Sequence, residues 1–221
     1  MKHQVLENPV KNQIPSFVLT IMACLLTALY ITANIMAVRV IRVGEISLFD
    51  AGTILFPFTY MLGDAVTELW GFKNARKVIL LTFFCNMIFV GFTSLGALLP
   101  YPDYQAETVA AYDAIFCFVP RIMAASMAAF LVGEISNAWL LVKIKEKTGE
   151  RFLWVRTIGS SILGHGLDSV LFVLLAFWGV CSAGELVSMI VSQYLLKLLL
   201  EAFGGTPLVY ALTGWLKRKL C

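Results

Sequence analysis

The sequence is poor in charged residues. Asp, Glu, Lys and Arg together make up 14% of its 221 residues, whereas hydrophobic residues make up 59%, and the mean hydropathy is +0.82. Soluble globular domains contain about a quarter charged residues. The low charge therefore argues against a soluble domain and nearly excludes a catalytic module that works in water.

Cysteine pairs and nucleotide-binding or metal-binding motifs are also lacking. The five cysteines are odd in number and irregularly spaced, so they predict neither a disulfide framework nor a metal site. No phosphate-binding loop of the ATPase kind is present, and the net charge of +3 gives no indication of nucleic acid binding. We therefore expect no cofactor, no metal ion and no nucleic acid partner. The cysteines are Cys24, Cys85, Cys117, Cys181 and Cys221.

The chain contains long apolar stretches instead. A transmembrane helix needs about 20 apolar residues, and six such stretches follow a polar tail, residues 1–15. In lipid the backbone must satisfy its own hydrogen bonds, so stretches this long predict helices. We expect an all-α polytopic membrane protein, a single six-helix domain over residues 1–221 surrounded by membrane lipid. The expected spans are Ser16–Val38, Leu48–Trp70, Lys77–Leu99, Ala114–Val142, Phe152–Trp178 and Leu186–Leu216.

The basic residues predict how these spans are oriented. Loops on the cytoplasmic side of a membrane are enriched in Lys and Arg. Basic residues cluster between expected spans two and three, between four and five, and after span six, whereas the loop 100–113 carries only acidic charges. We therefore expect both termini, including the short tail, to lie in the cytoplasm.

Helix-breaking residues fall inside two expected spans. Pro57 lies in the second, and Gly204-Gly205-Thr206-Pro207 lies in the sixth. Transporters use interrupted helices to line binding cavities. The same residues can also produce a simple packing kink, and both interpretations stay open at this point.

The two halves of the chain show a weak internal similarity. Three spans that start inside, followed by three that start outside, would form an inverted repeat. Thr53 precedes Asp64 by the same number of residues as Thr157 precedes Asp168, which would pair span two with span five. A 3+3 inverted repeat is therefore an expectation.

Several ionisable residues lie inside the expected spans. Each costs about 2.5–3.5 kcal/mol at mid-membrane by insertion scales, so such residues face the bundle interior and often mark solute or proton pathways. Asp64 and Glu68 share a helix face and can form a solute or proton site, or salt bridges. Lys197 and Glu201 also share a face and can pair with each other. The set comprises Asp64, Glu68, Arg121, Glu134, Arg156, Asp168, Lys197 and Glu201.

The expected fifth span contains residue types found in serine hydrolases. Ser160 and His165 are five residues apart, off a common helix face, and no nucleophile motif surrounds Ser160. His165 has no second or third metal ligand near it in sequence. We expect no enzyme, and we interpret Ser160, Arg156 and Glu201 as helix-pairing or coupling residues.

Residues 56–71, FPFTYMLGDAVTELWG, resemble the signature of the queuosine precursor transporters, the VUT family. The shared pattern is an FP-x-T-Y run, a Gly-Asp, a Thr-Glu and an aromatic-Gly pair. The similarity extends over roughly residues 34–217, and His165 is a departure, since an amide is expected there. Supporting positions are Asn34, Arg121, Arg156, Ser160, Asp168, Lys197 and Thr206-Pro207.

The resemblance implies import of a 7-deazaguanine base across the cell (inner) membrane: 7-cyano-7-deazaguanine, 7-aminomethyl-7-deazaguanine or queuine. A carboxylate can accept both adjacent N–H donors of such a base, basic or amide side chains can donate to its ring atoms, and aromatic rings can stack on it. The candidate substrate-binding residues are Asn34, Phe56, Tyr60, Asp64, Glu68, Arg121, Asn137, Asp168 and Lys197.

Other functions stay open. The chain could be the substrate-binding subunit of an ATP-driven importer of vitamins or nucleobases, in which case partner ATPases would supply the energy. A scaffold role fits poorly with the buried charges. Faces of small residues such as 125–133 can pack helices within one chain or between two, so a homodimer is a further alternative.

Overall fold

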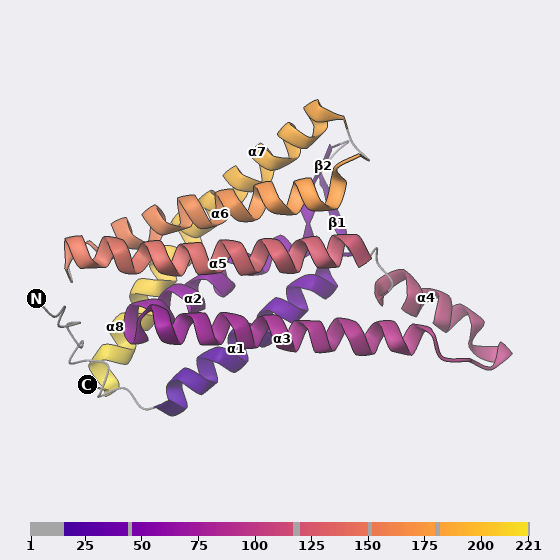
Figure 1. The fold of residues 1–221 in the computed structure, drawn as a ribbon, viewed down its shortest axis with the longest axis horizontal. Helices are drawn as coiled ribbons and strands as arrows, with labels where there is room; N and C mark the ends of the chain where they lie inside the picture. Colours follow the sequence, from indigo (N-terminus) through magenta and orange to yellow (C-terminus); the bar gives the residue numbers. More distant parts are fainter. Residues whose placement is uncertain (1–15, 44–45, 117–119, 150–151, 180–181, 221) are drawn as a thin grey trace, which may run out of the picture.

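The computed structural model describes residues 16–43, 46–116, 120–149, 152–179 and 182–220 (Figure 1). The N-terminal tail, Cys117, Cys181 and Cys221 lie outside these ranges. Long helices dominate the described chain. Its elements are α1 (Ser16–Met36), β1 (Val40–Val43), β2 (Ile46–Asp50), η2 (Ala51–Leu55), α2 (Phe56–Trp70), α3 (Phe72–Ala97), η3 (Asp103–Gln105), α4 (Ala106–Phe116), α5 (Pro120–Thr148), α6 (Leu153–Phe177), α7 (Ala183–Leu200), η4 (Glu201–Gly205) and α8 (Thr206–Leu220).

Five segments of the described chain are long and apolar enough to cross a membrane: Ser16–Met36, Phe72–Ala97, Ala124–Thr148, Leu153–Phe177 and Ala183–Leu216. Their outer faces are apolar. On α3, for example, Phe84, Ile88 and Phe92 follow one another at four-residue spacing and are 58%, 60% and 70% exposed. A stripe of this kind suits contact with lipid chains. The protein is a multi-pass helical membrane protein.

The second expected span, Leu48–Trp70, is wrong in its first part. Strand β2 and the 3₁₀ helix η2 occupy those residues, and α2 begins at Phe56. Pro57 lies in the first turn of α2, where its missing N–H costs no hydrogen bond, so it interrupts no span. With 15 residues, α2 is about 22 Å long. The expected count of six spans stays a prediction.

Helix α2 is the central element of the bundle. Almost every residue from Thr59 to Trp70 is buried, and α2 packs against α1, α3, α5, α8 and η4. The helix ends at Gly71, whose φ of 76° suits glycine because it lacks a Cβ. This single residue joins α2 to α3. Polar side chains on α2 therefore point into protein on every side.

The fourth expected span, Ala114–Val142, is also misplaced at its start. Residues 114–116 belong to α4, a helix that occupies much of the expected loop 100–113, and α5 begins only at Pro120. The all-α expectation also missed one element of the structure, a pair of short strands. Strands β1 and β2 form a short antiparallel hairpin with an irregularity between Ile41 and Arg42.

The sixth expected span is helical without a break from Ala183 to Leu216, and its helical geometry changes at the glycines and the proline. A π-helical segment, η4, separates α7 from α8 and packs against α2. Such π segments are often found at functional sites.

Helices α5 and α6 lie side by side along most of their length (Figure 1). Two glycines allow their close contact. A Cβ on Gly133 would be 3.0 Å from the Gly164 carbonyl oxygen, and a Cβ on Gly164 would be 2.8 Å from the Asn137 Cβ. The contact holds Asn137 on α5 and Asp168 on α6 in the same region of the bundle.

The ends of the helices separate into two groups. The start of α1, the α2–α3 junction, the end of α5 and the end of α8 lie at one end of the bundle, at the left in Figure 1. The hairpin, α4 and the start of α7 lie at the other end. The 3+3 inverted repeat stays a prediction.

Candidate functional site

The site is built on one face of α2. Tyr60, Asp64 and Glu68 follow one another at four-residue spacing and therefore share that face. Their exposed fractions are 2%, 0% and 2%. The face is thus a buried polar stripe, and each residue meets a different set of partners.

Glu68 is neutralised by two basic residues. Its Oε1 atom accepts hydrogen bonds from Arg156 Nη2 and from Lys145 Nζ, each at 2.9 Å. Lys145 also donates to the Glu68 carbonyl, and Arg156 donates to the Gly149 carbonyl. This network ties α2 to α5 and α6 at the end of the bundle where α5 terminates. Of the alternatives open in the sequence, the salt bridge is the one observed for Glu68.

Asp168 is also paired. Lys197 on α7 donates to Asp168 Oδ2, and both residues are buried. Lys197 therefore pairs with a residue of α6. A pair between Lys197 and Glu201, four residues further along the chain, was the alternative that the sequence allowed. Both oxygens of Glu201 have no hydrogen-bond partner in the described chain.

Three carboxyl groups form a cluster at the centre of the bundle, which we call the central acid cluster: Asp64, Glu134 and Glu201. Asp64 Oδ1 accepts a 2.7 Å hydrogen bond from the Asn137 amide. Asp64 Oδ2 and both oxygens of Glu134 and Glu201 have no partner among the described residues. Glu134 interacts electrostatically with both other members. Buried polar atoms are almost always hydrogen-bonded, so these atoms are open to partners that the described residues do not supply.

Aromatic and neutral polar groups lie beside the cluster. The Tyr60 and His165 rings have centroids 4.1 Å apart at an angle of 50°. Both ring nitrogens of His165 and the Asn137 Oδ1 atom also have no partner within the described ranges, nor do the hydroxyls of Ser161 and Ser169, which lie four residues before and after His165 on α6. Apart from one donor on neutral His165 and the hydroxyls, these atoms are acceptors. The site therefore suits a ligand rich in N–H donors.

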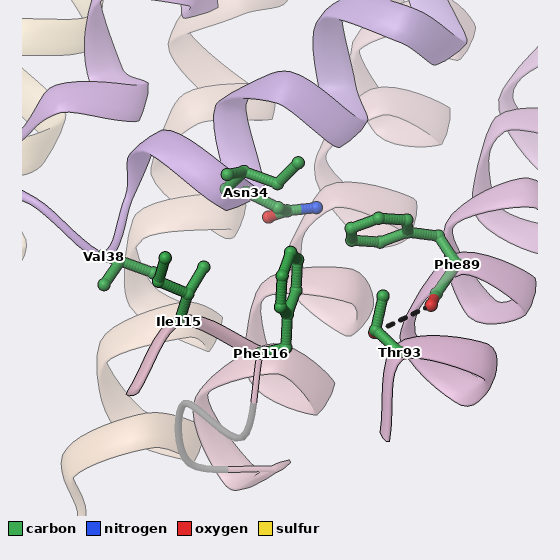
Figure 2. Close-up of a pocket in the computed structure, with 7 residues that line it drawn as sticks. Asn34, Val38, Phe89, Thr93, Ile115 and Phe116 are labelled. Carbon is green, nitrogen blue, oxygen red and sulfur yellow. Dashed lines mark hydrogen bonds between the residues drawn. The ribbon is translucent and has the colours of Figure 1, made fainter. Parts of the chain in front are cut away.

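A second polar cluster lies between α1, α3 and α5. Asn34 donates to Asn86 Oδ1 at 3.0 Å, and Ser126 donates to Asn34 Oδ1 at 3.2 Å. A small pocket opens beside it, lined by Asn34 and Ile35 of α1, by Val38 and by residues of α3 and α4. Figure 2 shows the Asn34 amide pointing towards the rings of Phe89 and Phe116. This pocket lies at the end of the bundle that carries α4.

A protein family model described as "Putative vitamin uptake transporter" matches residues 50–212. The chain belongs to this family. Among its relatives, a "Probable queuosine precursor transporter" of Bacillus subtilis (strain 168) is 25% identical over 182 residues, 82% of this chain and 78% of the relative. The "Queuosine precursor transporter" of Escherichia coli (strain K12) is 24% identical over 174 residues, 76% and 75% of the two chains.

A third relative, the "Probable queuosine precursor transporter" of Haemophilus influenzae, is 28% identical over 128 residues, which cover 58% of this chain and 51% of the relative. No solved structure is similar enough to the chain to count as a match. The family resemblance expected from residues 56–71 is thus confirmed.

The structure brings six of the predicted residues into one region: Tyr60, Asp64, Asn137, Asp168, Lys197 and Glu201. Glu68 and Arg156 form the separate network near the end of α5, and Asn34 belongs to the cluster between α1, α3 and α5. Ser160 is buried and donates to the Thr157 carbonyl. The side chains of Phe56 and Arg121 lie outside the described part of the chain.

Several residues of these networks were not in the predicted site, Glu134, Lys145 and Asn86 among them. Glu134 is central, and its presence in an apolar span was the available signal. Lys145 was assigned to a loop because it lies in a basic run, and Asn86 carried no pattern that could have singled it out.

Proposed function

We propose that this chain carries a queuosine precursor, a 7-deazaguanine base, across the membrane and binds it beside the central acid cluster. Membership of a transporter family and three relatives named as queuosine precursor transporters support the proposal. The observation that carries it is the set of buried acceptor atoms without partners around Asp64 and Asn137.

The chemistry of the base matches these acceptors. A guanine-like edge presents two adjacent N–H donors, and a carboxylate accepts such a pair in a two-pronged geometry. Asp64 Oδ2 and Asn137 Oδ1 each have an acceptor site open. The Tyr60 and His165 rings supply a face for stacking, and His165 supplies a donor for the base oxygen.

All three precursors share this edge. In 7-cyano-7-deazaguanine, 7-aminomethyl-7-deazaguanine and queuine, the substituent at position 7 lies on the other side of the ring system. Asp64 and Asn137 would therefore recognise the common part of each. We further propose six spans with both termini in the cytoplasm, which puts the basic ends of α5 and α8 inside.

Uptake in living cells tests the proposal. The chain is expressed in bacteria that cannot make queuosine precursors, a trace of each base is added, and queuosine is measured in tRNA. Asp64→Asn replaces an acceptor by a donor and should lower uptake about tenfold or more, since a hydrogen bond to a charged group contributes about 1.5–3 kcal/mol. Asp103→Asn makes the same change at an exposed position and should leave uptake unchanged.

Two results would contradict the proposal. Unchanged uptake by Asp64→Asn would remove the carboxylate from base recognition. No queuosine from any precursor, with the protein present in the membrane, would favour a different solute or a dependence on partner proteins. Uptake by the purified chain in liposomes would exclude the partner-dependent alternative.

A further inference from the structure

Glu134 stands out among the buried carboxyl groups. It lies near the middle of α5, is 1% exposed, and has no hydrogen-bond partner for either oxygen among the described residues. Its carboxyl group lies against the backbone of α2, because a Cβ added to Gly63 would be 2.9 Å from Glu134 Oε2. Little room for a bulky ligand is left on that side.

The charges around Glu134 are mainly negative. Asp64, Asp168 and Glu201 all interact with it electrostatically, and of these only Asp168 has a basic partner in the described chain. The titratable groups that interact with it are Tyr30 on α1, Tyr60 and Asp64 on α2, Asp168 on α6 and Glu201 on η4. Next to these lie His165, beside the Tyr60 ring, and Lys197 on α7, which donates to Asp168.

A bound cation would stabilise this group of buried carboxylates. Carboxylates held together in a low-dielectric interior repel one another, and each one loses its hydration. The described residues contain no group of three or more His, Cys, Asp or Glu side chains placed to hold a metal ion. A proton needs neither further ligands nor added volume, so it is the cation that fits the space beside Gly63.

We propose that Glu134 is a proton-binding site that couples entry of a proton to entry of the base. This proposal rests on the proposed function. The Glu134 carboxylate takes a proton from a hydronium ion on the outer side, so that one O–H bond of hydronium breaks, one O–H bond forms on Glu134 and a water molecule is left. When the bundle opens to the cytoplasm the bond on Glu134 breaks and the proton passes to water. Glu134 and Asn137 are three residues apart on α5, so the proton and the base would occupy neighbouring positions.

Purified protein in liposomes tests the coupling. The substrate is 7-cyano-7-deazaguanine, which carries no charge, and a pH-sensitive dye is enclosed. An inward gradient of one pH unit should sustain up to about tenfold accumulation at one proton per base, because one pH unit and a tenfold concentration ratio represent the same free energy. The dye should report acidification, and a protonophore should abolish accumulation.

The decisive variant is Glu134→Gln. It should still exchange internal for external base, because exchange needs no net proton movement, and it should lose gradient-driven accumulation. Glu107→Gln makes the same change at an exposed site on α4 and should behave as wild type. If Glu134→Gln does not fold, Glu134→Asp takes its place and should shift the pH at which transport is half-maximal.

The outcomes separate the two proposals. No exchange by the wild type would contradict the proposed function itself. Exchange without acidification, or accumulation driven by a sodium gradient alone, would overturn proton coupling and leave the function standing. A folded Glu134→Gln protein that still accumulates base with the gradient, or that loses exchange, would overturn the role of Glu134, as would an unshifted pH dependence in Glu134→Asp.

Discussion

Buried charges at the residue scale divide into those with basic partners and those without. Glu68 and Asp168 are held by Arg156, Lys145 and Lys197. The partners come from different helices, and Glu68 and Arg156 are 88 residues apart in the chain. Breaking such a pair leaves a charge buried without compensation, which is why the paired residues are expected to matter first for stability.

Arg156→Gln should destabilise the protein by about 1.5–3 kcal/mol, because it removes one charge-assisted hydrogen bond to Glu68 while Lys145 remains paired with the same carboxylate. The thermal unfolding midpoint of the purified protein in detergent measures the loss. Arg218→Gln, at an exposed position, serves as the matched control. The double variant Glu68→Gln/Arg156→Gln should recover part of the loss, and a double variant less stable than Arg156→Gln would contradict this view of the pair.

The sequence indicated which residues would be functional candidates more readily than how they would be arranged. Asp64, Glu68, Asp168 and Lys197 were predictable because a charge in an apolar span is costly. Their partners were not, because pairing depends on how helices from distant parts of the chain pack. Lys145 shows the difference, since its basic neighbours in sequence placed it in a loop, whereas α5 extends past it to Thr148.

At the scale of single elements, a helix was predictable from the sequence where its apolar stretch had clear ends. The α6 helix, Leu153–Phe177, lies within the expected fifth span. The start of α2 was placed too early because β2 and η2 are largely apolar, and Asp50, Gly52 and Pro57 mark the boundary only weakly. The tight contact between α5 and α6 likewise depends on two glycines, Gly133 and Gly164, that are ordinary in sequence.

Gly164→Ala should weaken the α5–α6 contact. The added Cβ would be 2.8 Å from the Asn137 Cβ and 3.1 Å from the Gly133 carbonyl oxygen, and overpacking of this kind typically costs about 1–3 kcal/mol. The unfolding midpoint and base uptake should both fall, since Asn137 would be displaced from Asp64. Gly166→Ala on the same helix meets nothing closer than 3.7 Å and should be tolerated. Equal effects of the two variants would show that the glycine contact is unimportant.

The arrangement of the whole molecule agrees with the charge pattern of its loops. The ends of α5 and α8 lie at one end of the bundle, and α4 with the hairpin lies at the other (Figure 1). The last turn of α5 carries Lys145 and Lys147, whereas the first turn of α4 carries Glu107. Positive charge is enriched in cytoplasmic loops, so the end of the bundle with the basic residues of α5 is expected to face the cytoplasm. This expectation depends on which helix ends lie together and not on whether α2 counts as a span.

Sidedness is tested with single cysteines in a background where the five native cysteines are replaced. Glu107→Cys on α4 should react with a membrane-impermeant maleimide in intact cells, because that end is expected outside. Lys147→Cys, also exposed, should react only after the membrane is permeabilised, because the basic end is expected in the cytoplasm. The reverse pattern would invert the orientation, and the proton and the base would then have to enter past the basic end of α5. Labelling of both positions in intact cells would place both ends on one side and rule out the arrangement in which α5 crosses the membrane.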